Sequence, residues 1–425
     1  MVLDTFLIRI YSFSSNDQSL SNVRVVIFTA LAIVCTSAQF LILEYAKRQS
    51  VEIRRKRQLH LRLIHRIITF AQYTLTLVIA LIILDMTITS SYSIGLEAFV
   101  VGITYGLGLT VLGLLSQRFF SWFKSNRNII VILYGLSSSF LSINAALTLG
   151  FVLSIFLNSH AQVRSYIGGS LSPFIVPGSV ADILNVPYII STILSYSICW
   201  TATIFTLRYY SPKLRGKIYS VILILPLLYF LVQFLPQFQE LILSIQAEST
   251  FFNYTVVFTF SKAVGGILFG LAFWIVARTL GKSNKVRTYL IMSAYGWVLL
   301  FLSNQAVVLV NITYPPFGLV TISFFGIASY LLLLGVYSSA ISISEDSRLR
   351  QSIRQLALDE HKLLDSIGTA QMNQDIQRRV LTISKKTQNL MTQESGIQTS
   401  LGEDEMKRYV QEVLDEVHRA KTKSE

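Results

Sequence analysis

The sequence predicts an all-α fold: a polytopic transmembrane helix bundle of about nine spans with a cytoplasmic helical, partly coiled-coil-like tail. Three observations lead to this prediction. Of the 425 residues, 52% are hydrophobic and 14% are charged, which is too apolar for a soluble globular protein. Repeated apolar runs of about 18 residues or more can each cross roughly 30 Å of hydrocarbon as a helix. At Ser344 the composition changes abruptly to mixed-charge, helix-forming sequence.

The predicted spans follow one another through short connections. They cover about 24–45, 66–89, 95–117, 129–157, 186–207, 218–236, 253–277, 288–310 and 317–342. Pro226 falls inside the sixth span and predicts a kink, because proline removes a backbone donor. Gly102 with Gly106, and Gly266 with Gly270, have small-xxx-small spacing, which predicts close helix packing within the bundle.

The charge distribution predicts the orientation. Residues 344–425 hold 13 Lys/Arg against 14 Asp/Glu, so the net charge of +13 arises in the first 343 residues. Nineteen basic residues lie in four loops, 47–66, 117–128, 208–217 and 278–287. The opposite side holds only Arg9, Arg24 and Arg164. By the positive-inside rule, a cell-membrane protein with this bias has its N-terminus outside and its C-terminus in the cytoplasm, which requires an odd number of spans. Basic residues in such loops do not indicate a nucleic-acid partner.

The chain therefore divides into five predicted regions: an extracytoplasmic segment at 1–23, the bundle at 24–343, an amphipathic helix at 344–392, a linker at 393–402 and a second amphipathic helix at 403–425. The longest outer loop, 158–185, contains glycines and prolines that break any helix, yet it is apolar enough to lie on the bilayer surface. A covering loop and a ligand lid are both compatible with this composition.

The tail carries an apolar seam that its own helix cannot bury. The spacing is 4-3-7-4 in the first part and 4-3-7 in the second, with a slip between them at Gly368. The first part is Leu349, Ile353, Leu356, Leu363 and Ile367, and the second is Ile376, Val380, Ile383 and Leu390. We expect the last span to continue into this helix. Ile353, Leu356, Leu363 and Ile367 form the predicted partner-binding seam, covered by another copy in a homo-oligomer, by the second helix or by a separate cytoplasmic protein.

The second tail helix has its own start signal. Ser400 and Glu403 form a capping box, and acidic residues fill the first turn, as the helix dipole favours. Its apolar face consists of Met406, Val410, Val413, Leu414 and Val417.

The junction YPPFGLVTISFFGIASYLLLLGVYSSAISISEDSRLRQSIR, with LLDSIGTAQM behind it, resembles a group of uncharacterised multi-span membrane proteins from archaea. The resemblance covers the last span and the first half of the tail. It implies a membrane location and no catalytic activity.

Lys262 is the unusual residue of the bundle, because it lies in the apolar run VFTFSKAVGGILFG. It follows Asn253 by nine residues, about 13 Å along a helix, which predicts a position near the middle of the bilayer. A lysine facing lipid there would cost roughly 2.5–3.5 kcal/mol. We therefore expect the ammonium to face the bundle interior and to meet a carboxylate, a carbonyl or water. Asp85 and Glu97 are the nearest carboxylates by predicted depth, and the three residues form the candidate intramembrane site, structural or functional.

Other chemistry is sparse. Cys35 and Cys199 both lie in apolar runs, and the five histidines are scattered, so we predict no metal site and no cofactor. No nucleophile–base set is visible, and we predict that the chain is not an enzyme. A receptor-like or scaffold protein with the lipid bilayer and a tail partner as its contacts is the first functional hypothesis. A secondary transporter or permease for a small solute, with a site near Lys262, is the alternative.

The predicted orientation can be tested by cysteine labelling from outside the cell. A cysteine in place of Ser170 should react with an impermeant reagent, whereas one in place of Ser395 should not, because the second lies in the cytoplasm. Labelling of the Ser395 position in intact cells would overturn the orientation.

Overall fold

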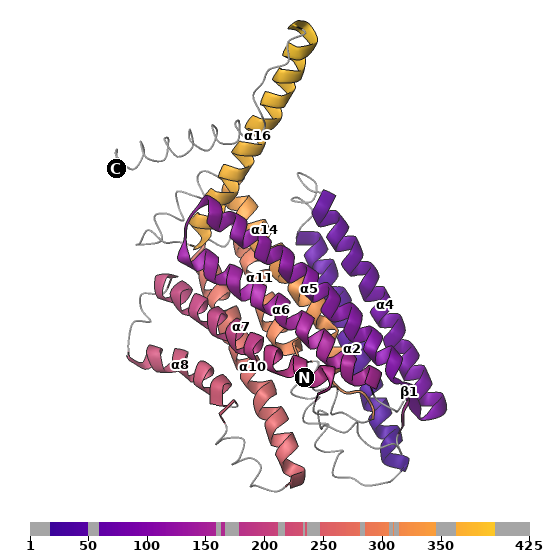
Figure 1. Ribbon diagram of the computed structural model, residues 1–425. Coiled ribbons are helices and arrows are strands. Elements are labelled where there is room, and N and C mark those ends of the chain that lie inside the picture. Colours follow the sequence, from indigo (N-terminus) through magenta and orange to yellow (C-terminus); the bar gives the residue numbers. More distant parts are fainter. Residues whose placement is uncertain are drawn as a thin grey trace.

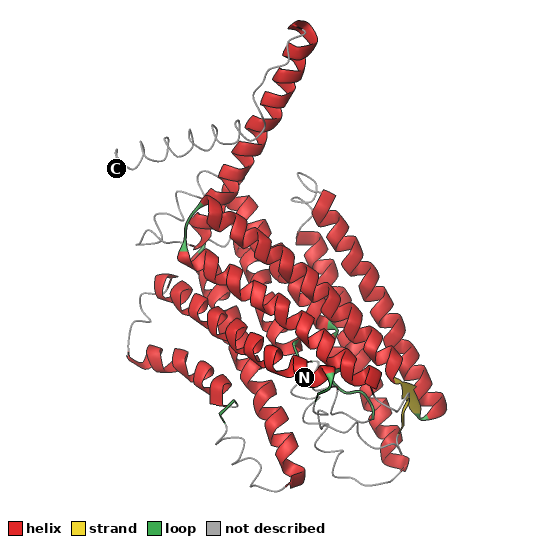
Figure 2. Ribbon diagram, in the orientation of Figure 1, coloured by secondary structure: helices red, strands yellow, loops and turns green. Residues whose placement is uncertain are grey.

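The computed structural model describes the greater part of the chain as a bundle of long helices (Figure 1). The described residues are 18–49, 59–158, 163–165, 178–210, 217–232, 234–235, 247–280, 285–305, 309, 314–345 and 363–395. Helices dominate them, and two three-residue strands lie at one end of the bundle (Figure 2). The predicted all-α class is confirmed.

The helices are numbered along the chain. The first half comprises α2 (Gln18–Gln49), α4 (Leu59–Thr89), α5 (Ile94–Ser125) and α6 (Ile129–Asn158). The second half comprises α7 (Val180–Tyr210), α8 (Lys217–Val232), α10 (Ala247–Thr279), α11 (Lys285–Ser303), α13 (Leu319–Ile322), α14 (Phe324–Glu345) and α16 (Leu363–Ser395). The strands are β1 (Ser91–Ser93) and β2 (Val163–Ser165).

Eight helices among the described residues are long and apolar enough to cross a membrane, which makes this a membrane protein. The predicted sixth span, 218–236, corresponds to α8, whose 16 residues extend about 24 Å and fall short of a typical hydrocarbon core. The count of nine spans is therefore not confirmed.

The direction of the helices bears on this count. Lys262 and then Ala272 of α10 lie beside Tyr188 and then Leu207 of α7, so the two helices run parallel. The chain must therefore return along the bundle between them. The described part of the return is α8, which runs antiparallel to α7: Tyr196 lies beside Pro226, and Trp200 lies beside Leu223, earlier in α8.

Pro226 lies inside α8, as predicted, and removes the donor that would pair with a preceding carbonyl. Two side chains of α7 hydrogen-bond to carbonyl groups around it. Tyr196 Oη donates to the Pro226 carbonyl at 3.1 Å, and Trp200 Nε1 donates to the Leu223 carbonyl at 2.8 Å. The carbonyl that lacks a donor because of Pro226 is that of Ile222, four residues earlier, so these two bonds tie α8 to α7 beside the proline without replacing the missing donor.

The stretch formed by α13 and α14 is the centre of the bundle. In its most apolar 18-residue window 89% of the residues are buried, compared with 22% in the corresponding window of α2. A Cβ on Gly335 would lie 2.6 Å from the Tyr289 carbonyl, and one on Gly296 would lie 2.8 Å from the Leu332 nitrogen. These two glycines allow the backbones of α11 and α14 to approach closely.

The two predicted glycine pairs differ. The prediction for Gly266 and Gly270 is confirmed, because a Cβ on Gly270 would lie 2.5 Å from Val298 Cγ2 on α11. The prediction for Gly102 and Gly106 is wrong, since nothing lies within 4 Å of a Cβ at either position. These two glycines face away from the neighbouring helices, so the spacing alone did not identify the packed face.

The turn between α4 and α5 is tied to the loop after α6. Strands β1 and β2 pair antiparallel, with Tyr92 opposite Arg164. Ser93 also caps α5, because its Oγ accepts a hydrogen bond from the Gly95 nitrogen at 3.2 Å. The rest of the predicted outer loop up to residue 177 lies outside the described residues.

The tail helix α16 begins at Leu363 and folds against the end of the bundle. A Cβ on Gly368 would lie 2.3 Å from Ile343 Cγ2 of α14. One straight helix would separate these residues by about 37 Å. The prediction that the last span continues as one helix into the tail is therefore wrong. Residues 346–362, with Ile353 and Leu356, and residues 396–425 lie outside the described part of the chain.

Gly270, which packs against α11, and Gly106, which faces open space, make a matched test of packing. Gly270→Ala places a methyl group against Val298 and the Ala294 carbonyl and should cost about 1–3 kcal/mol of stability. Gly106→Ala meets open space and should leave the protein as stable or slightly more stable, because alanine is the better helix former. Thermal unfolding in detergent measures both. Equal effects of the two changes would contradict the described packing of α10 on α11.

Candidate functional site

Lys262 lies inside the bundle, as predicted. It is the sixteenth residue of α10, and 2% of its surface is exposed. Its Nζ donates to the carbonyl oxygen of Asn304 at 3.3 Å. Asn304 is the first residue after α11, so the lysine meets the C-terminal end of a neighbouring helix.

This contact offsets part of the cost of a cation in an apolar bundle. The last carbonyl groups of a helix lack intrahelical donors and carry the negative end of the helix dipole. The Lys262 ammonium therefore supplies to the end of α11 both a donor and a positive charge. The Tyr188 ring adds a weaker attraction, since Nζ lies 6.0 Å from its centroid.

Asparagine side chains connect this helix end to three other helices. Asn304 Nδ2 donates to Asn144 Oδ1 of α6 at 3.2 Å, and Tyr105 Oη of α5 donates to Asn304 Oδ1 at 3.1 Å. Asn144 Nδ2 in turn donates to Thr192 Oγ1 of α7 at 2.7 Å. We call Lys262, Asn304, Asn144, Tyr105 and Thr192 the buried polar cluster. All five side chains are buried, and they come from α5, α6, α7, α10 and the end of α11.

The backbone next to the cluster is irregular and buried. Asn304 and Gln305 follow α11 without forming a helix, and Tyr314 and Phe317 precede α13 in the same manner. Non-helical backbone inside a membrane bundle is tolerated where protein or a water-filled cavity surrounds it. Here the amide and hydroxyl groups of the cluster surround the end of α11.

The position of Lys262 along the bundle differs from the simple expectation. It is halfway along α10, but its partner Asn304 is 19 residues beyond Lys285, about 28 Å along α11. The lysine therefore lies toward the end of α11 that is remote from the basic 278–287 loop. Helix α10 extends from Lys262 back to Ala247, about 22 Å along its axis, whereas α11 ends beside Lys262 at Ser303. The predicted depth of Lys262 in the bilayer stays a prediction.

The two predicted carboxylates occupy different places. Glu97 is fully buried in the first turn of α5, where the helix dipole favours a negative charge, and it precedes Tyr105 by about 12 Å along the axis. Asp85 is half-buried near the end of α4 and accepts a hydrogen bond from Thr89 Oγ1 at 3.2 Å. Burial, and to a lesser degree the Asp85 charge, raises the pKa of Tyr314. Pairing of either carboxylate with Lys262 stays a prediction.

Sequence reasoning missed Asn144, Asn304 and Tyr105. The two asparagines could have been identified from the sequence, because an amide in an apolar span needs a hydrogen-bond partner and such side chains commonly bond to neighbouring transmembrane helices. Tyrosine is common in this chain, with 20 copies, so nothing in the sequence distinguished Tyr105.

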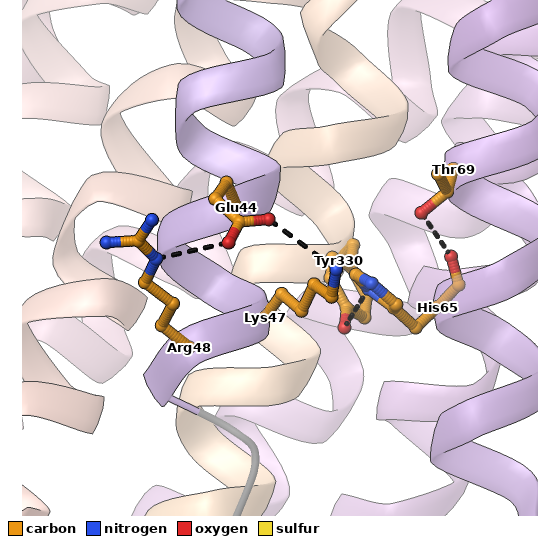
Figure 3. A network of polar contacts seen from close by, with 6 residues as sticks. All are labelled: Glu44, Lys47, Arg48, His65, Thr69 and Tyr330. Atoms are coloured by element: carbon orange, nitrogen blue, oxygen red, sulfur yellow. Dashed lines mark hydrogen bonds and ion pairs between the residues drawn. The ribbon is translucent and has the colours of Figure 1, made fainter.

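A second set of polar contacts ties α4 to α14, and α2 to Ser323 between α13 and α14. His65 Nδ1 lies 3.0 Å from Tyr330 Oη, and Gln39 Nε2 donates to Ser323 Oγ at 2.6 Å. Gln72 Nε2 donates to Gln39 Oε1, which links α4 to α2. Figure 3 shows His65 facing Tyr330, near the end of α2.

That end of α2 also holds surface ion pairs. Glu44 lies 3.1 Å from Arg48 and 3.7 Å from Lys47. These side chains are largely exposed, and such pairs contribute little to stability. Within the described ranges, no three His, Cys, Asp or Glu residues gather in a group that could hold a metal ion.

No family model matches this chain, and no curated protein or solved structure shows significant similarity to it.

The cap on α11 predicts the effect of removing the Lys262 ammonium. Lys262→Met leaves the buried Asn304 carbonyl without this donor and should lower the free energy of unfolding by about 1–3 kcal/mol. Lys124→Met, which changes an exposed lysine of α5, is the matched control and should have a much smaller effect. Thermal unfolding of the purified variants is the measurement.

The same series tests the pairing with carboxylates. If Lys262 is paired with Glu97 or Asp85, adding Glu97→Gln or Asp85→Asn to Lys262→Met should restore part of the lost stability, because it removes an uncompensated charge. A Lys262→Met protein as stable as the wild type would argue against both the cap and the pairing.

Proposed function

We propose that this membrane protein is receptor-like or a scaffold, which couples its bundle to a cytoplasmic partner through the tail helix α16. The observation that carries the proposal is the docking of α16 on the end of the bundle. A tail that is only tethered to its last span would have no means of sensing the arrangement of other helices. This one contacts α5, α6 and α14.

The docking combines apolar burial with specific hydrogen bonds. Leu363 and Ile367, two residues of the predicted seam, are buried in the bundle's own core cluster. The bundle itself, which was not among the expected partners, is therefore what covers this part of the seam. Trp122 Nε1 of α5 donates to Gln371 Oε1 at 3.0 Å, and Asn128 Nδ2 donates to Ser366 Oγ at 2.6 Å.

The docked helix touches the central element of the bundle. Gly368 of α16 lies against Ile343 of α14, and α14 packs backbone to backbone on α11 at Gly335 and Gly296. Helix α11 ends at Asn304, the acceptor for Lys262. These packed elements supply a continuous route between the buried polar cluster and the tail. Coupling along this route means that a change in the packing of one end shifts the equilibrium at the other end.

The orientation belongs to the same proposal: N-terminus outside, C-terminus cytoplasmic, in the cell membrane. The basic loops 47–66, 117–128, 208–217 and 278–287 support it by the positive-inside rule. The parallel course of α7 and α10 supports it too, because a return between them puts the 208–217 and 278–287 loops on one side. The tail helix then lies in the cytoplasm.

A secondary transporter is the second candidate, and the buried polar cluster favours it. Transporter sites are often built where a helix is interrupted, with side chains and free backbone groups around the substrate. Lys262 at the end of α11 has this character. Uptake of a solute by reconstituted protein, lost in Lys262→Met and kept in Lys124→Met, would distinguish this function from a receptor.

Coupling between bundle and tail can be measured through the docking contact of Gln374 with Ser121, whose side chains lie 2.9 Å apart. With Cys35 and Cys199 changed to Ala, the Ser121→Cys/Gln374→Cys pair should form a disulfide. Its rate of formation should change about fivefold or more when Gly270→Ala perturbs the α10–α11 packing, as a coupling of about 1 kcal/mol implies. Gly106→Ala is the matched control and should not change it.

A disulfide rate that is indifferent to Gly270→Ala, in a protein shown by unfolding to be perturbed, would contradict the coupling. A pair that never forms a disulfide would contradict the docking itself.

A further inference from the structure

Beyond its docked part, α16 exposes the rest of its apolar seam. The helix projects away from the bundle (Figure 1). Ile376 is 38% exposed, Val380 is 39% exposed and Ile383 is 65% exposed, whereas Leu363 and Ile367 are almost fully buried. The exposed residues keep the 4-3 spacing of a helix that packs along another helix. Outside the membrane an exposed apolar face of this kind marks an interaction surface.

A second copy of the same helix is a poor occupant because of charge. Two copies in one membrane are related by an axis along the membrane normal, so their tails would run parallel. Residues 376–395 hold four basic residues and one acidic residue. A parallel pair would therefore bring together two helices that each carry a net charge of +3. Like charges along a helix pair disfavour it.

The C-terminal segment of the same chain has the opposite charge. Residues 403–416 hold six acidic and two basic residues, a net charge of −4. Seven residues, 396–402, separate this segment from the end of α16. Connections of two to eight residues commonly join antiparallel helices, and a short tether gives the segment a high local concentration.

The apolar positions of the two segments also match. With the turn at 396–402, an antiparallel hairpin places Ile383 opposite Val417 and Leu390 opposite Val410. Lys386 and Glu416 then take facing positions beside the seam. Arg379 and Lys423 form a like-charged pair at the open end of the hairpin, where solvent and salt screen it.

From these observations we infer that residues 403–425 fold back as a helix on the exposed seam of α16 and form an antiparallel helical hairpin. The occupant of the seam beyond the bundle is then the chain itself. A cytoplasmic protein that used this seam would have to displace the C-terminal helix first. The inference does not depend on the proposed receptor function, since a hairpin can form in a transporter as well.

Disulfide formation in the full-length protein, with Cys35 and Cys199 changed to Ala, tests the hairpin. Ile383→Cys/Val417→Cys should cross-link within one chain, on the order of tenfold faster than the matched pair Ile383→Cys/Arg419→Cys, whose second position lies off the seam. The intramolecular product runs as a monomer on a non-reducing gel. The Ser121→Cys/Gln374→Cys disulfide, formed separately, verifies that α16 is still docked.

A charge exchange provides the second readout. Glu416→Lys should slow the Ile383–Val417 cross-link about twofold to fivefold, and adding Lys386→Glu should restore its rate, as expected of an exposed ion pair. Cross-linking at the same rate in both cysteine pairs would overturn the inference. So would a disulfide-linked dimer as the main product of Ile383→Cys alone, which would assign the seam to a second copy.

Discussion

Backbone groups that leave a helix inside an apolar bundle need hydrogen-bond partners, and much of this structure follows from that requirement. Beside Pro226, which interrupts the hydrogen-bond pattern of α8, Tyr196 and Trp200 of α7 donate to the carbonyl groups of Pro226 and Leu223. At the end of α11, the donor is the Lys262 ammonium. A cation is well suited to the second case, because the end of a helix carries partial negative charge as well as free acceptors. The same residue that is costly among apolar side chains is therefore favourable beside Asn304.

The hydrogen-bond requirement also explains why polar side chains gather where they do. Asn304 and Asn144 each carry both donors and acceptors, so each buried amide needs further polar partners. The contacts therefore extend to Tyr105 and Thr192. Four helices and the end of a fifth are positioned by these bonds. Between α14 and α11, by contrast, the backbones approach closely at Gly335, and dispersion forces between closely packed atoms contribute to this contact. The bundle combines a tightly packed centre with a polar cluster at the level where α11 ends.

The sequence was sufficient for the class of fold, because long apolar runs have few other solutions, and for the burial of Lys262, because lipid exposure is costly there. It was insufficient for features that depend on which face of a helix points inward. Gly102 and Gly106 share their spacing with Gly266 and Gly270 but face open space. The partner of Lys262 could not be predicted either, since a backbone carbonyl becomes an acceptor only where a helix stops. Likewise, the heptad-like spacing of Leu363 and Ile367 showed an apolar face without showing that the bundle's own end, at Ile343, would cover part of it.

The polar contacts of α2 and α4 have a consequence for the order in which the protein is assembled during synthesis. These helices are made before α14, and their partners Ser323, which immediately precedes α14, and Tyr330 of α14 are made almost 300 residues after Gln39. During that interval the amides of the first hairpin would lie in lipid without the central helix. Gln72 of α4 donates to Gln39 of α2, so these two helices satisfy part of each other's hydrogen-bonding capacity before α14 is made. The hydrogen bond between Gln39 and Gln72 thus allows α2 and α4 to pair in the membrane before Ser323 and Tyr330, their later partners, have been synthesised.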